Sequence, residues 1–345
     1  MSLKDLPKTL WWEDSVLKLI DQSLLPQEFK IIALESVEEV AEAISVMRVR
    51  GAPAIGITAA YGLVLAALNS AAKTSKELSN DLLKAKERLA STRPTAVNLF
   101  WALKKVMSVT EDPDANIDTI KRNVLDMANK LWKEDIETNR KIGQHGMKLI
   151  QEGMNLETHC NAGSLATVYY GTALAPMYLA AEEGKNFHVW VDETRPRLQG
   201  ARLTIWELQK AGIDCTLITD NMAGHLMQNN LVDLVIVGAD RVSGNTGDVA
   251  NKIGTYMLAL AAHDNNVPFY VAAPISTIDF EIQSGKETKI EERNVDEVLS
   301  IRGKQISPAK KAKNFAFDVT PSKYVKGIIT ERGVFSPNQL KTLGD

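Results

Sequence analysis

Cysteine is scarce in this sequence of 345 residues, which has two thiols, Cys160 and Cys215. Two cysteines argue against a disulfide framework, and no spacing between cysteine and histidine resembles a zinc site. The five histidines likewise have no metal-type spacing, and none is assigned as a ligand. Cys215 alternates within the apolar segment 213–218, which predicts a strand, so we interpret its thiol as a packing group.

An excess of one charge is also lacking, because 40 basic and 43 acidic residues give a net charge of −3. Proteins that bind nucleic acid or membrane surfaces usually have a basic bias, so neither partner is expected. The first residues have no apolar segment of signal-peptide type, and no apolar run of spanning length is evident. We therefore expect a cytoplasmic protein with no membrane partner.

Two phosphate-binding fingerprints are missing as well. No Gly-x-Gly-x-x-Gly follows a predicted strand, and no Gly-x-x-x-x-Gly-Lys-Ser/Thr sequence occurs. Their absence argues against nicotinamide and nucleoside-triphosphate chemistry. The chain nevertheless has the length and the apolar content, 45% of its residues, of a globular protein with a large core.

The apolar pattern divides the chain into two predicted domains of an α/β protein. Residues 1–130 predict a mainly helical domain with a small β element, and residues 131–345 predict a Rossmann-like domain with a doubly wound parallel sheet. The small β element is predicted as a hairpin of residues 10–12 and 16–20, to which residues 29–34 add a third strand. Helices of the first domain are expected at 36–49, 54–69, 75–91, 96–108 and from Asp114, a candidate N-cap.

Strands and helices alternate in the second domain, which is the pattern of βαβ units. The predicted strands are 156–159, 188–192, 214–218, 234–237, 269–272 and 316–319. The predicted helices are 163–183, 199–211, 222–228 and 249–264.

Cys160 stands where the strand 156–159 gives way to small and polar residues and then to a predicted helix. A thiol at such a junction faces a helix N-terminus, whose dipole and N–H groups favour the thiolate and bind anions. Asp240 repeats this position after the buried strand 234–237. Ligands bind at the carboxyl ends of parallel strands, so this pair indicates acid–base chemistry on a small anionic substrate. His159 should point to the opposite face, which favours a packing or orienting role.

Arg50 and Gly51 open the segment Arg-Gly-Ala-Pro-Ala-Ile-Gly between two predicted helices. Gly51 permits a close backbone approach, Pro53 suits a first helical turn, and Arg50 adds a cation, which together suit a phosphate cradle. A simple turn between helices explains the segment equally well. Arg93, just before Pro94, is a second candidate for a phosphate or a sugar hydroxyl, although a structural role is commoner for such an arginine.

A polar loop follows the predicted strand 188–192 at the ligand end of the sheet. In this loop, residues 192–200, we expect Gln199 and Arg195 to face the crevice. A purely structural loop is an equally good interpretation.

A second polar loop follows Asp240 and leads to Asn251 and Lys252, which are expected on the opening turn of the helix 249–264. There Lys252 would neutralise a phosphate or an oxyanion, and Asn251 would bond a hydroxyl. Asp248 is interpreted as the cap of that helix. The density of polar groups favours a functional site over a set of caps.

Together these segments resemble the methylthioribose-1-phosphate isomerase family, which is related to regulatory subunits of translation initiation factor 2B. The likeness extends over nearly the whole chain and lies in residues 50–56, 93–101, 158–163, 192–196, 199–204, 238–241 and 251–256. Members convert 5-methylthioribose 1-phosphate to 5-methylthioribulose 1-phosphate in methionine salvage. The resemblance implies a phosphorylated pentose as substrate, no metal, no organic cofactor and a homodimer. The loop 242–247 is slightly longer than is usual in the family, which bears on loop closure.

The resemblance also implies which residues form the site. Cys160 and Asp240 would be the catalytic pair, and the substrate contacts would be Arg50, Gly51, Ala52, Arg93, Gln199, Asn251 and Lys252. An aldose blocked as its 1-phosphate cannot open as a free sugar does. Asp240 is therefore assigned as the general acid that protonates the ring oxygen. This role requires its carboxyl group to be protonated near neutral pH. Cys160 is the base of an enediol route or steadies the charged intermediate of a hydride route, and the sequence leaves both open.

Two other functions remain compatible with the sequence. The first is a sister isomerase acting on ribose 1,5-bisphosphate or 5-deoxyribose 1-phosphate, of which the bisphosphate would need an additional cationic pocket. The second is a non-enzymatic regulatory subunit of the translation-factor type. The joint presence of Cys160, Asp240 and Lys252 argues against the second.

Overall fold

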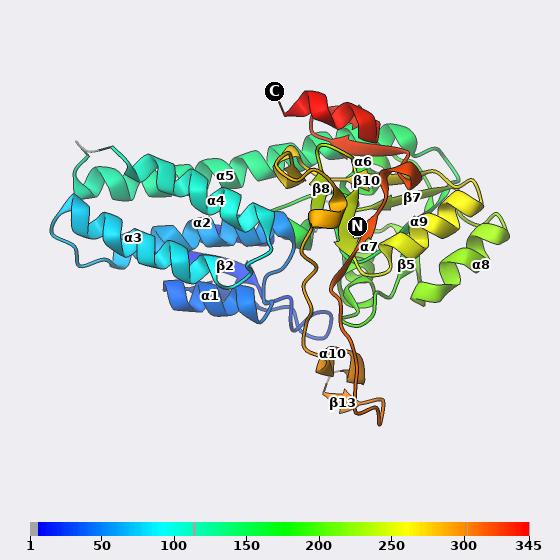
Figure 1. Ribbon diagram of the computed structural model, residues 1–345, viewed down its shortest axis with the longest axis horizontal. Coiled ribbons are helices and arrows are strands. Elements are labelled where there is room, and N and C mark those ends of the chain that lie inside the picture. The colour runs from blue at the N-terminus through cyan, green and yellow to red at the C-terminus, as the bar shows by residue number, and fades with distance from the viewer. Residues whose placement is uncertain (1–5, 113–114, 302, 345) are drawn as a thin grey trace. The chain divides into compact units, whose positions relative to one another are not determined.

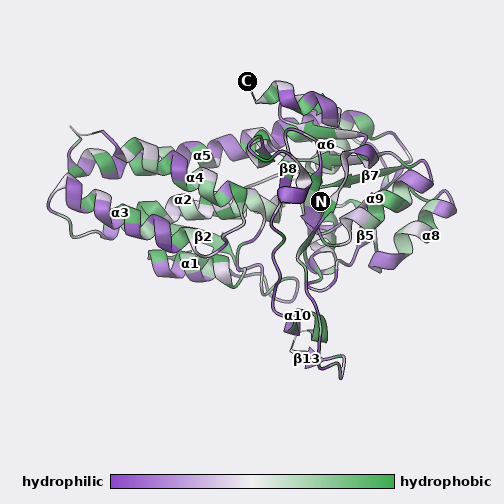
Figure 2. Ribbon diagram, viewed as in Figure 1, coloured by the Kyte–Doolittle hydropathy of each residue, from purple (hydrophilic) through white to green (hydrophobic). Residues whose placement is uncertain are grey.

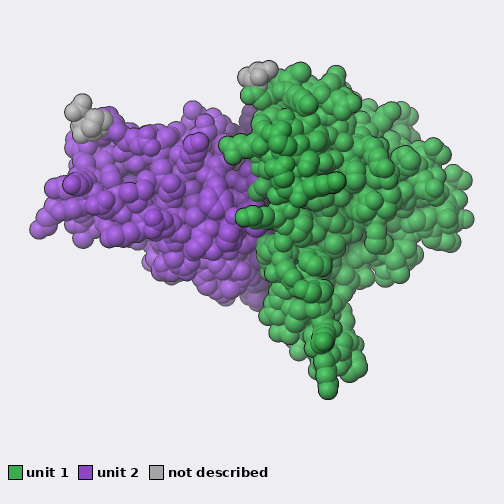
Figure 3. Space-filling model, in the orientation of Figure 1, with its two compact units in different colours: residues 1–6, 140–163, 172–345 green, residues 7–139, 164–171 purple. Residues whose placement is uncertain are grey.

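The computed structural model describes residues 6–112, 115–301 and 303–344 (Figure 1). The described residues form two compact units, which Figure 3 shows in different colours. Unit 2 comprises residues 7–139 and 164–171, and unit 1 comprises the other described residues. The division after residue 139 falls inside the long helix α5 (Ile117–Gly146), which also contains the predicted domain boundary at residue 130.

A small antiparallel sheet begins unit 2. Strands β1 (Leu10–Glu13) and β2 (Val16–Ile20) form a hairpin, and β3 (Ile31–Leu34) pairs with the other edge of β2. Asp14 and Ser15 join the hairpin with φ of 54° and 63°, as a two-residue type I′ turn requires. The predicted hairpin is confirmed, and so is the third strand, with a later start.

The helices of unit 2 lie where the sequence predicts them: α1 (Val37–Ser45), α2 (Ala52–Asn69), α3 (Ser75–Ala90), α4 (Val97–Met107) and α5. Ser36 and Thr74 open α1 and α3 with capping boxes, in which each side chain accepts a backbone N–H of the first turn. Both α3 and α5 carry hydrophilic and hydrophobic residues along their length, as helices with one buried face do (Figure 2). The predicted N-cap Asp114 lies outside the described residues.

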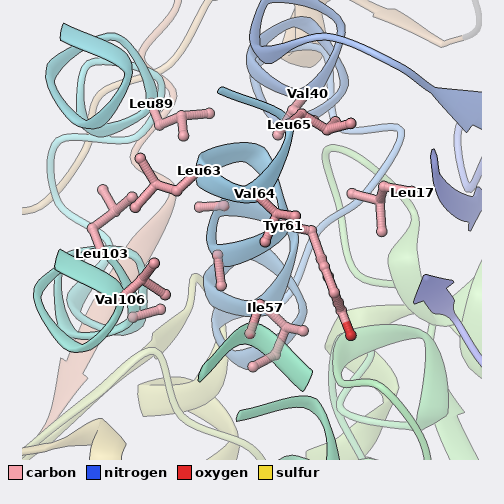
Figure 4. Packing of buried hydrophobic residues seen from close by; sticks show 14 of the residues in the cluster. Leu17, Val40, Ile57, Tyr61, Leu63, Val64, Leu65, Leu89, Leu103 and Val106 are labelled. Carbon is pink, nitrogen blue, oxygen red and sulfur yellow. The ribbon is translucent and has the colours of Figure 1, made fainter. Parts of the chain in front are cut away.

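Helix α2 is the centre of the unit 2 core. Its side chains project in several directions, Leu63 on the side of Leu89 and Leu103, and Tyr61 on the side of Leu17 (Figure 4). By length and composition α2 could cross a membrane, with a mean hydropathy of 1.5, but 78% of it is buried inside the protein. The prediction that no apolar run reaches spanning length is therefore wrong, and burial on all sides explains the composition.

Unit 1 is built on a seven-stranded sheet with the order β16-β15-β10-β7-β4-β5-β6. Its strands are β4 (Asn155–Thr158), β5 (His188–Asp192), β6 (Asp214–Ile218), β7 (Leu234–Val237), β10 (Phe269–Ala272), β15 (Gly327–Thr330) and β16 (Gly333–Phe335). Neighbours are parallel, except that the edge strand β16 is antiparallel to β15. Numbered along the chain, the parallel strands have the order 3-2-1-4-5-6 of a Rossmann fold. The predicted α/β class with a Rossmann-like parallel sheet is confirmed.

Helices α6 (Ala175–Glu182), α7 (Ile205–Ala211), α8 (Ala223–Gln228) and α9 (Thr255–Asp264) follow strands of unit 1. The predictions for α7 and α8 are confirmed, with a π-helical turn preceding α7. The helix predicted over 163–183 is wrong, because α6 covers only its last part. Tyr170 and Gly171 have φ of 70° and 78°, which an α-helix does not accommodate.

The helix predicted over 249–264 is also wrong in its first turn, because these residues form strand β9 (Val249–Lys252) and α9 starts later. A four-stranded sheet of order β11-β8-β9-β14 contains this strand, with β8 (Arg241–Ser243), β11 (Ile278–Asp279) and β14 (Phe317–Thr320). The strand predicted at 316–319 is therefore real but belongs to this sheet. The strand β15, which was not predicted, stands beside β10 in the larger sheet.

Candidate active site

Cys160 and Asp240 follow the two strands that flank the point where the strand order of the large sheet reverses. Cys160 comes after β4, Asp240 comes after β7, and these strands are direct neighbours. The hydroxyl of Thr158 donates to the carbonyl of Ile236 at 2.8 Å, which ties the two strand ends together. In open α/β sheets this switch point is where ligands bind. The topology thus supports the expectation that both residues serve one crevice.

The backbone of Cys160 is held by two threonines rather than by a helix. Its N–H donates to the hydroxyl of Thr194 at 2.8 Å, and its carbonyl accepts from the hydroxyl of Thr204 at 2.6 Å. Its φ of 65° lies in the left-handed region, which is uncommon outside glycine and is concentrated at functional sites. The expectation that the thiol faces the start of an α-helix is wrong, since only a 3-10 turn, Ser164–Ala166, precedes α6.

Lys252 interacts electrostatically with both predicted catalytic residues, Cys160 and Asp240. It ends β9 and is 5% exposed, and burial lowers the pKa of its ammonium group. The electrostatic influence of Cys160 and Asp240 acts in the opposite direction and partly restores that pKa. A buried cation that interacts with a thiol and a carboxyl group is a suitable partner for an anionic substrate.

Asn251, the residue before Lys252, and Gln199, in the loop after β5, are also buried. The amide nitrogen of Asn251 donates to the hydroxyl of Thr255 at 3.0 Å, so the position on a strand end, not on a helix, orients it. Gln199 is 8% exposed, and its side-chain oxygen has no hydrogen-bond partner among the residues that the structure describes. A buried amide oxygen without a partner costs free energy, which a donor on a ligand would recover.

Two other predictions for the polar loops are corrected. Arg195 donates to the carbonyls of Pro196 and Val298 at 2.9 Å, so its guanidinium supports the loop rather than a ligand. Asp248 does not cap a helix, because the residues after it form β9. Its carboxylate instead accepts the backbone N–H groups of Ser322 and Gly285, which joins three loops and lowers its pKa.

A charged cluster near Lys252 was missed by the sequence analysis. Glu297, on the short helix α10 (Asp296–Leu299), accepts from Arg197 at 2.6 Å and from Arg293 at 3.0 Å. Burial alone would raise the pKa of Glu297, but the hydrogen bonds from Arg293 and Arg197 lower it to about 2. The charges of Arg293 and Glu297 also act on Lys252. Arg293 and Glu297 are four residues apart, but Arg197 is 100 residues away from Glu297, so no local pattern reveals the whole cluster.

His159 is almost fully buried and makes two hydrogen bonds through its ring. Nδ1 lies 2.8 Å from a carboxylate oxygen of Asp192, and Nε2 lies 2.9 Å from the carbonyl of Ile253. The expectation of a packing or orienting role, without a dyad to Cys160, is confirmed. His159, Asp192 and Asp220 offer ligand atoms within 4.8 Å of one another. The carboxylate of Asp220, however, already accepts two backbone N–H groups, so hydrogen bonding accounts for the cluster.

Glu157 lies on β4 with 0% exposure, and its carboxyl group shares a side-chain hydrogen bond with the carboxyl group of Asp192. Burial, and then the neighbouring Asp192 carboxylate, raise the pKa of Glu157. In the unfolded chain the group ionises near its ordinary pKa of 4.5. Above that pH the unfolded state therefore binds fewer protons than the folded state, and stability falls as the pH rises toward the folded pKa.

Replacing Glu157 with glutamine, which cannot ionise, is expected to remove this pH dependence. From about pH 5 upward, the free energy of unfolding of the variant relative to the unmodified chain should rise by up to about 1.4 kcal/mol per pH unit. Urea unfolding at several pH values between about pH 5 and pH 8 measures it. Glu152→Gln is the control: its exposed carboxylate has a lowered pKa, so its contribution should be constant in that range. A pH-independent difference for Glu157→Gln would contradict the expectation.

Unit 2 contains the remaining predicted contacts, Arg50, Gly51, Ala52 and Arg93. Gly51 precedes α2 with φ of 95°, and a Cβ there would lie 2.4 Å from the carbonyl oxygen of Ala166. Only glycine fits this position. Arg50 is 8% exposed, and Arg93 lies in the loop before α4. Ala52 is the first residue of α2, and the first N–H groups of a helix have no partner within that helix. These features agree with an anion cradle.

The profile of the initiation factor 2 subunit family matches residues 48–337. The chain belongs to this family. The resemblance noted from the sequence is confirmed by a methylthioribose-1-phosphate isomerase of Acetivibrio thermocellus, which is 54% identical over 332 residues that cover 96% of this chain and 97% of that protein.

Two further members of the family extend the comparison. A 5-deoxyribose 1-phosphate isomerase of Bacillus cereus is 51% identical and covers 94% of this chain and 93% of its own length. The crystal structure of 5-methylthioribose 1-phosphate isomerase from Pyrococcus horikoshii matches with a TM-score of 0.92 and 48% identity, covering 100% of this chain and 98% of that one. Long, high-identity matches to proteins named as sugar-phosphate isomerases therefore exist within the initiation factor 2 subunit family.

Proposed function

We propose that this protein is an aldose–ketose isomerase that converts 5-methylthioribose 1-phosphate to 5-methylthioribulose 1-phosphate in methionine salvage. The proposal is carried by the 54% identity over nearly the full length to a protein named for that reaction. It is supported by the site, where Cys160, Asp240 and Lys252 interact at the switch point of a Rossmann-like sheet. The same support favours an enzyme over a regulatory subunit, which needs no buried cation beside a thiol and a carboxylate.

The first chemical step opens the ring while the anomeric phosphate stays in place. Asp240 donates a proton to the ring oxygen, the bond between that oxygen and C1 breaks, and C1 becomes a phosphorylated oxocarbenium centre. Lys252 stabilises the phosphate, and Gln199 and Asn251 bond sugar hydroxyls. Arg50, Gly51, Ala52 and Arg93 supply further phosphate contacts. Binding energy from the phosphate positions C1 and C2 for the next step.

Hydrogen then moves from C2 to C1 by one of two routes. In the first, the Cys160 thiolate takes the C2 proton to give an enediol phosphate, the resulting thiol gives a proton to C1, and the 2-hydroxyl proton returns to Asp240. In the second, C2 transfers a hydride directly to C1 while Asp240 accepts the hydroxyl proton, and the thiolate stabilises the cationic centre. Both routes balance without an external oxidant, a metal or an organic cofactor.

A sister substrate is the second candidate. The 51% identity to a protein named 5-deoxyribose 1-phosphate isomerase favours it, since the two substrates differ only in the group on C5. Ribose 1,5-bisphosphate would need a second cationic pocket. The balanced charge gives no reason for nucleic-acid or membrane partners, and the proposal therefore places the protein in the cytoplasm. The resemblance to the isomerase family adds a homodimer to the proposal.

Turnover of three substrates tests the proposal. The protein is incubated separately with 5-methylthioribose 1-phosphate, 5-deoxyribose 1-phosphate and ribose 1,5-bisphosphate, and ketose formation is followed by NMR. We expect turnover of the first, with a higher kcat/KM than for the bisphosphate. A preference for 5-deoxyribose 1-phosphate or for the bisphosphate would move the assignment to the sister reaction. No turnover of any of them would instead support a regulatory subunit.

A further inference from the structure

His159 connects two segments that belong to different sheets. It follows β4 of the seven-stranded sheet, and its Nε2 lies 2.9 Å from the carbonyl of Ile253, the residue after β9 of the four-stranded sheet. Among the described residues, no ladder pairs these two strands. The neighbours of this link along the chain are Cys160 on one side and Lys252 on the other. The imidazole therefore links the segment that contains Cys160 directly to the segment that contains Lys252.

The turn after Lys252 is shaped to receive this ring. Gly254 has φ of 104°, and a Cβ there would lie 2.9 Å from Cε1 of His159, closer than carbon atoms approach. The carboxylate of Asp318 accepts the N–H of Gly254 at 2.8 Å and that of Tyr256 at 3.1 Å. Two side chains thus hold the backbone of this turn: the carboxylate of Asp318 and the imidazole of His159.

The Nε2 nitrogen of His159 acts as a donor. The carbonyl of Ile253 can only accept, so Nε2 carries a proton, and Nδ1 faces the carboxylate of Asp192 at 2.8 Å. Burial alone would lower the pKa of His159, but the hydrogen bond to Asp192 and the charges of Asp192 and Asp220 raise it. Two further carboxyl groups lie in this network: Asp318 on β14, which is influenced by the charge of His159, and Glu157 on β4, which interacts with Asp192 at the end of β5. A ring that is hydrogen-bonded on both sides is a rigid support.

We propose that His159 is a positioning residue for the isomerase reaction: its link from Asp192 to the carbonyl of Ile253 holds the ammonium group of Lys252 in place beside Cys160. The proposal rests on the proposed function. Lys252 is buried and is influenced by the charge of Cys160, so a displacement of β9 changes both phosphate binding and the charge beside the thiol. The side chain of His159 itself touches no substrate in this proposal.

Two substitutions separate the two hydrogen bonds. His159→Asn places an amide nitrogen near Nδ1, which keeps the contact with Asp192 and loses Ile253. His159→Gln places one near Nε2, which keeps Ile253 and loses Asp192. We expect kcat to fall by about 10²-fold in His159→Asn, the typical cost of a misplaced group, and to fall much less in His159→Gln. KM should likewise rise more in His159→Asn than in His159→Gln. Equal losses in both variants, with equal thermal unfolding, would indicate a merely structural role and overturn the proposal.

A second measurement does not require turnover. The rate at which iodoacetamide alkylates Cys160 is measured against pH in chains that also carry Cys215→Ser. Loss of the positioned ammonium should shift the midpoint of this profile upward in His159→Asn and leave it nearly unchanged in His159→Gln. An unshifted profile in folded His159→Asn would sink the inference. If that variant does not fold, Gly254→Ala, whose Cβ would displace the ring, is measured in its place with the same expectation. Failure of the proposed function can be told apart from failure of this inference, because only the first would leave the unmodified chain without turnover.

Discussion

Asp240→Asn is expected to lower kcat for 5-methylthioribose 1-phosphate by about 10²–10⁴-fold, the usual contribution of a general acid. Asparagine keeps the size and polarity of the side chain but has no proton to give to the ring oxygen. The backbone N–H of residue 240 still donates to the carbonyl of Ala250 at 3.0 Å, so the loop should keep its shape. Ketose formation followed by NMR, with substrate binding measured by calorimetry, separates lost chemistry from lost affinity.

The matched control is Asp214→Asn. Asp214 is an exposed carboxylate at the first residue of β6, at the amino end of a strand in the same sheet, where it accepts from His188 at 2.8 Å. Ligands bind at the other ends of such strands, so this substitution should leave kcat within about twofold. If Asp240→Asn retained comparable activity, another group would have to protonate the ring oxygen and the assignment would be wrong.

Cys160→Ser is expected to produce a loss of similar size, about 10²–10⁴-fold in kcat. A serine hydroxyl remains protonated at neutral pH, so it neither takes the C2 proton nor presents a negative charge to a cationic intermediate. Cys215→Ser is the control, because burial raises the pKa of Cys215 to about 11 and its thiol stays protonated. Full activity in Cys160→Ser, or an equal loss in Cys215→Ser, would remove Cys160 from the mechanism.

The isotope pattern of the product assigns the role of Cys160. If the thiolate takes the C2 proton, turnover in deuterium oxide introduces deuterium at C1 of the ketose, because the abstracted proton exchanges with solvent. If hydrogen moves as a hydride, C1 keeps the hydrogen that left C2. Mass spectrometry of the product distinguishes the two patterns in the unmodified chain.

The large sheet could be predicted because its strands are short apolar runs with clear ends. The strands β5, β6, β7 and β10 have the bounds that the sequence indicates, and the order of these strands placed Cys160 and Asp240 at one switch point. The reason given for Cys160 was nevertheless wrong. Within the described residues a 3-10 turn, Ser164–Ala166, stands where the helix was expected to begin, and two threonine hydroxyls hold the backbone of Cys160.

The strand β9 could not be predicted because its polar residues are buried. Asn251 and Lys252 are each 5% exposed, so the alternation that marks a half-exposed strand is absent and the segment resembles the first turn of a helix. The cluster of Arg197, Arg293 and Glu297 could not be predicted either. Arg293 and Glu297 are four residues apart, a spacing common on solvated surfaces, and only the fold brings the distant Arg197 to them.

The segment 164–171 has a consequence for the order in which the protein forms during synthesis. It belongs to unit 2, where Val168 is fully buried, its carbonyl accepts from Thr9 at 3.0 Å, and its N–H donates to Asp135 at 2.7 Å. The ribosome adds this segment only after it has added β4 of unit 1. The amino-terminal unit therefore completes its core late, and residues 7–139 expressed by themselves would lack one of the pieces that close it.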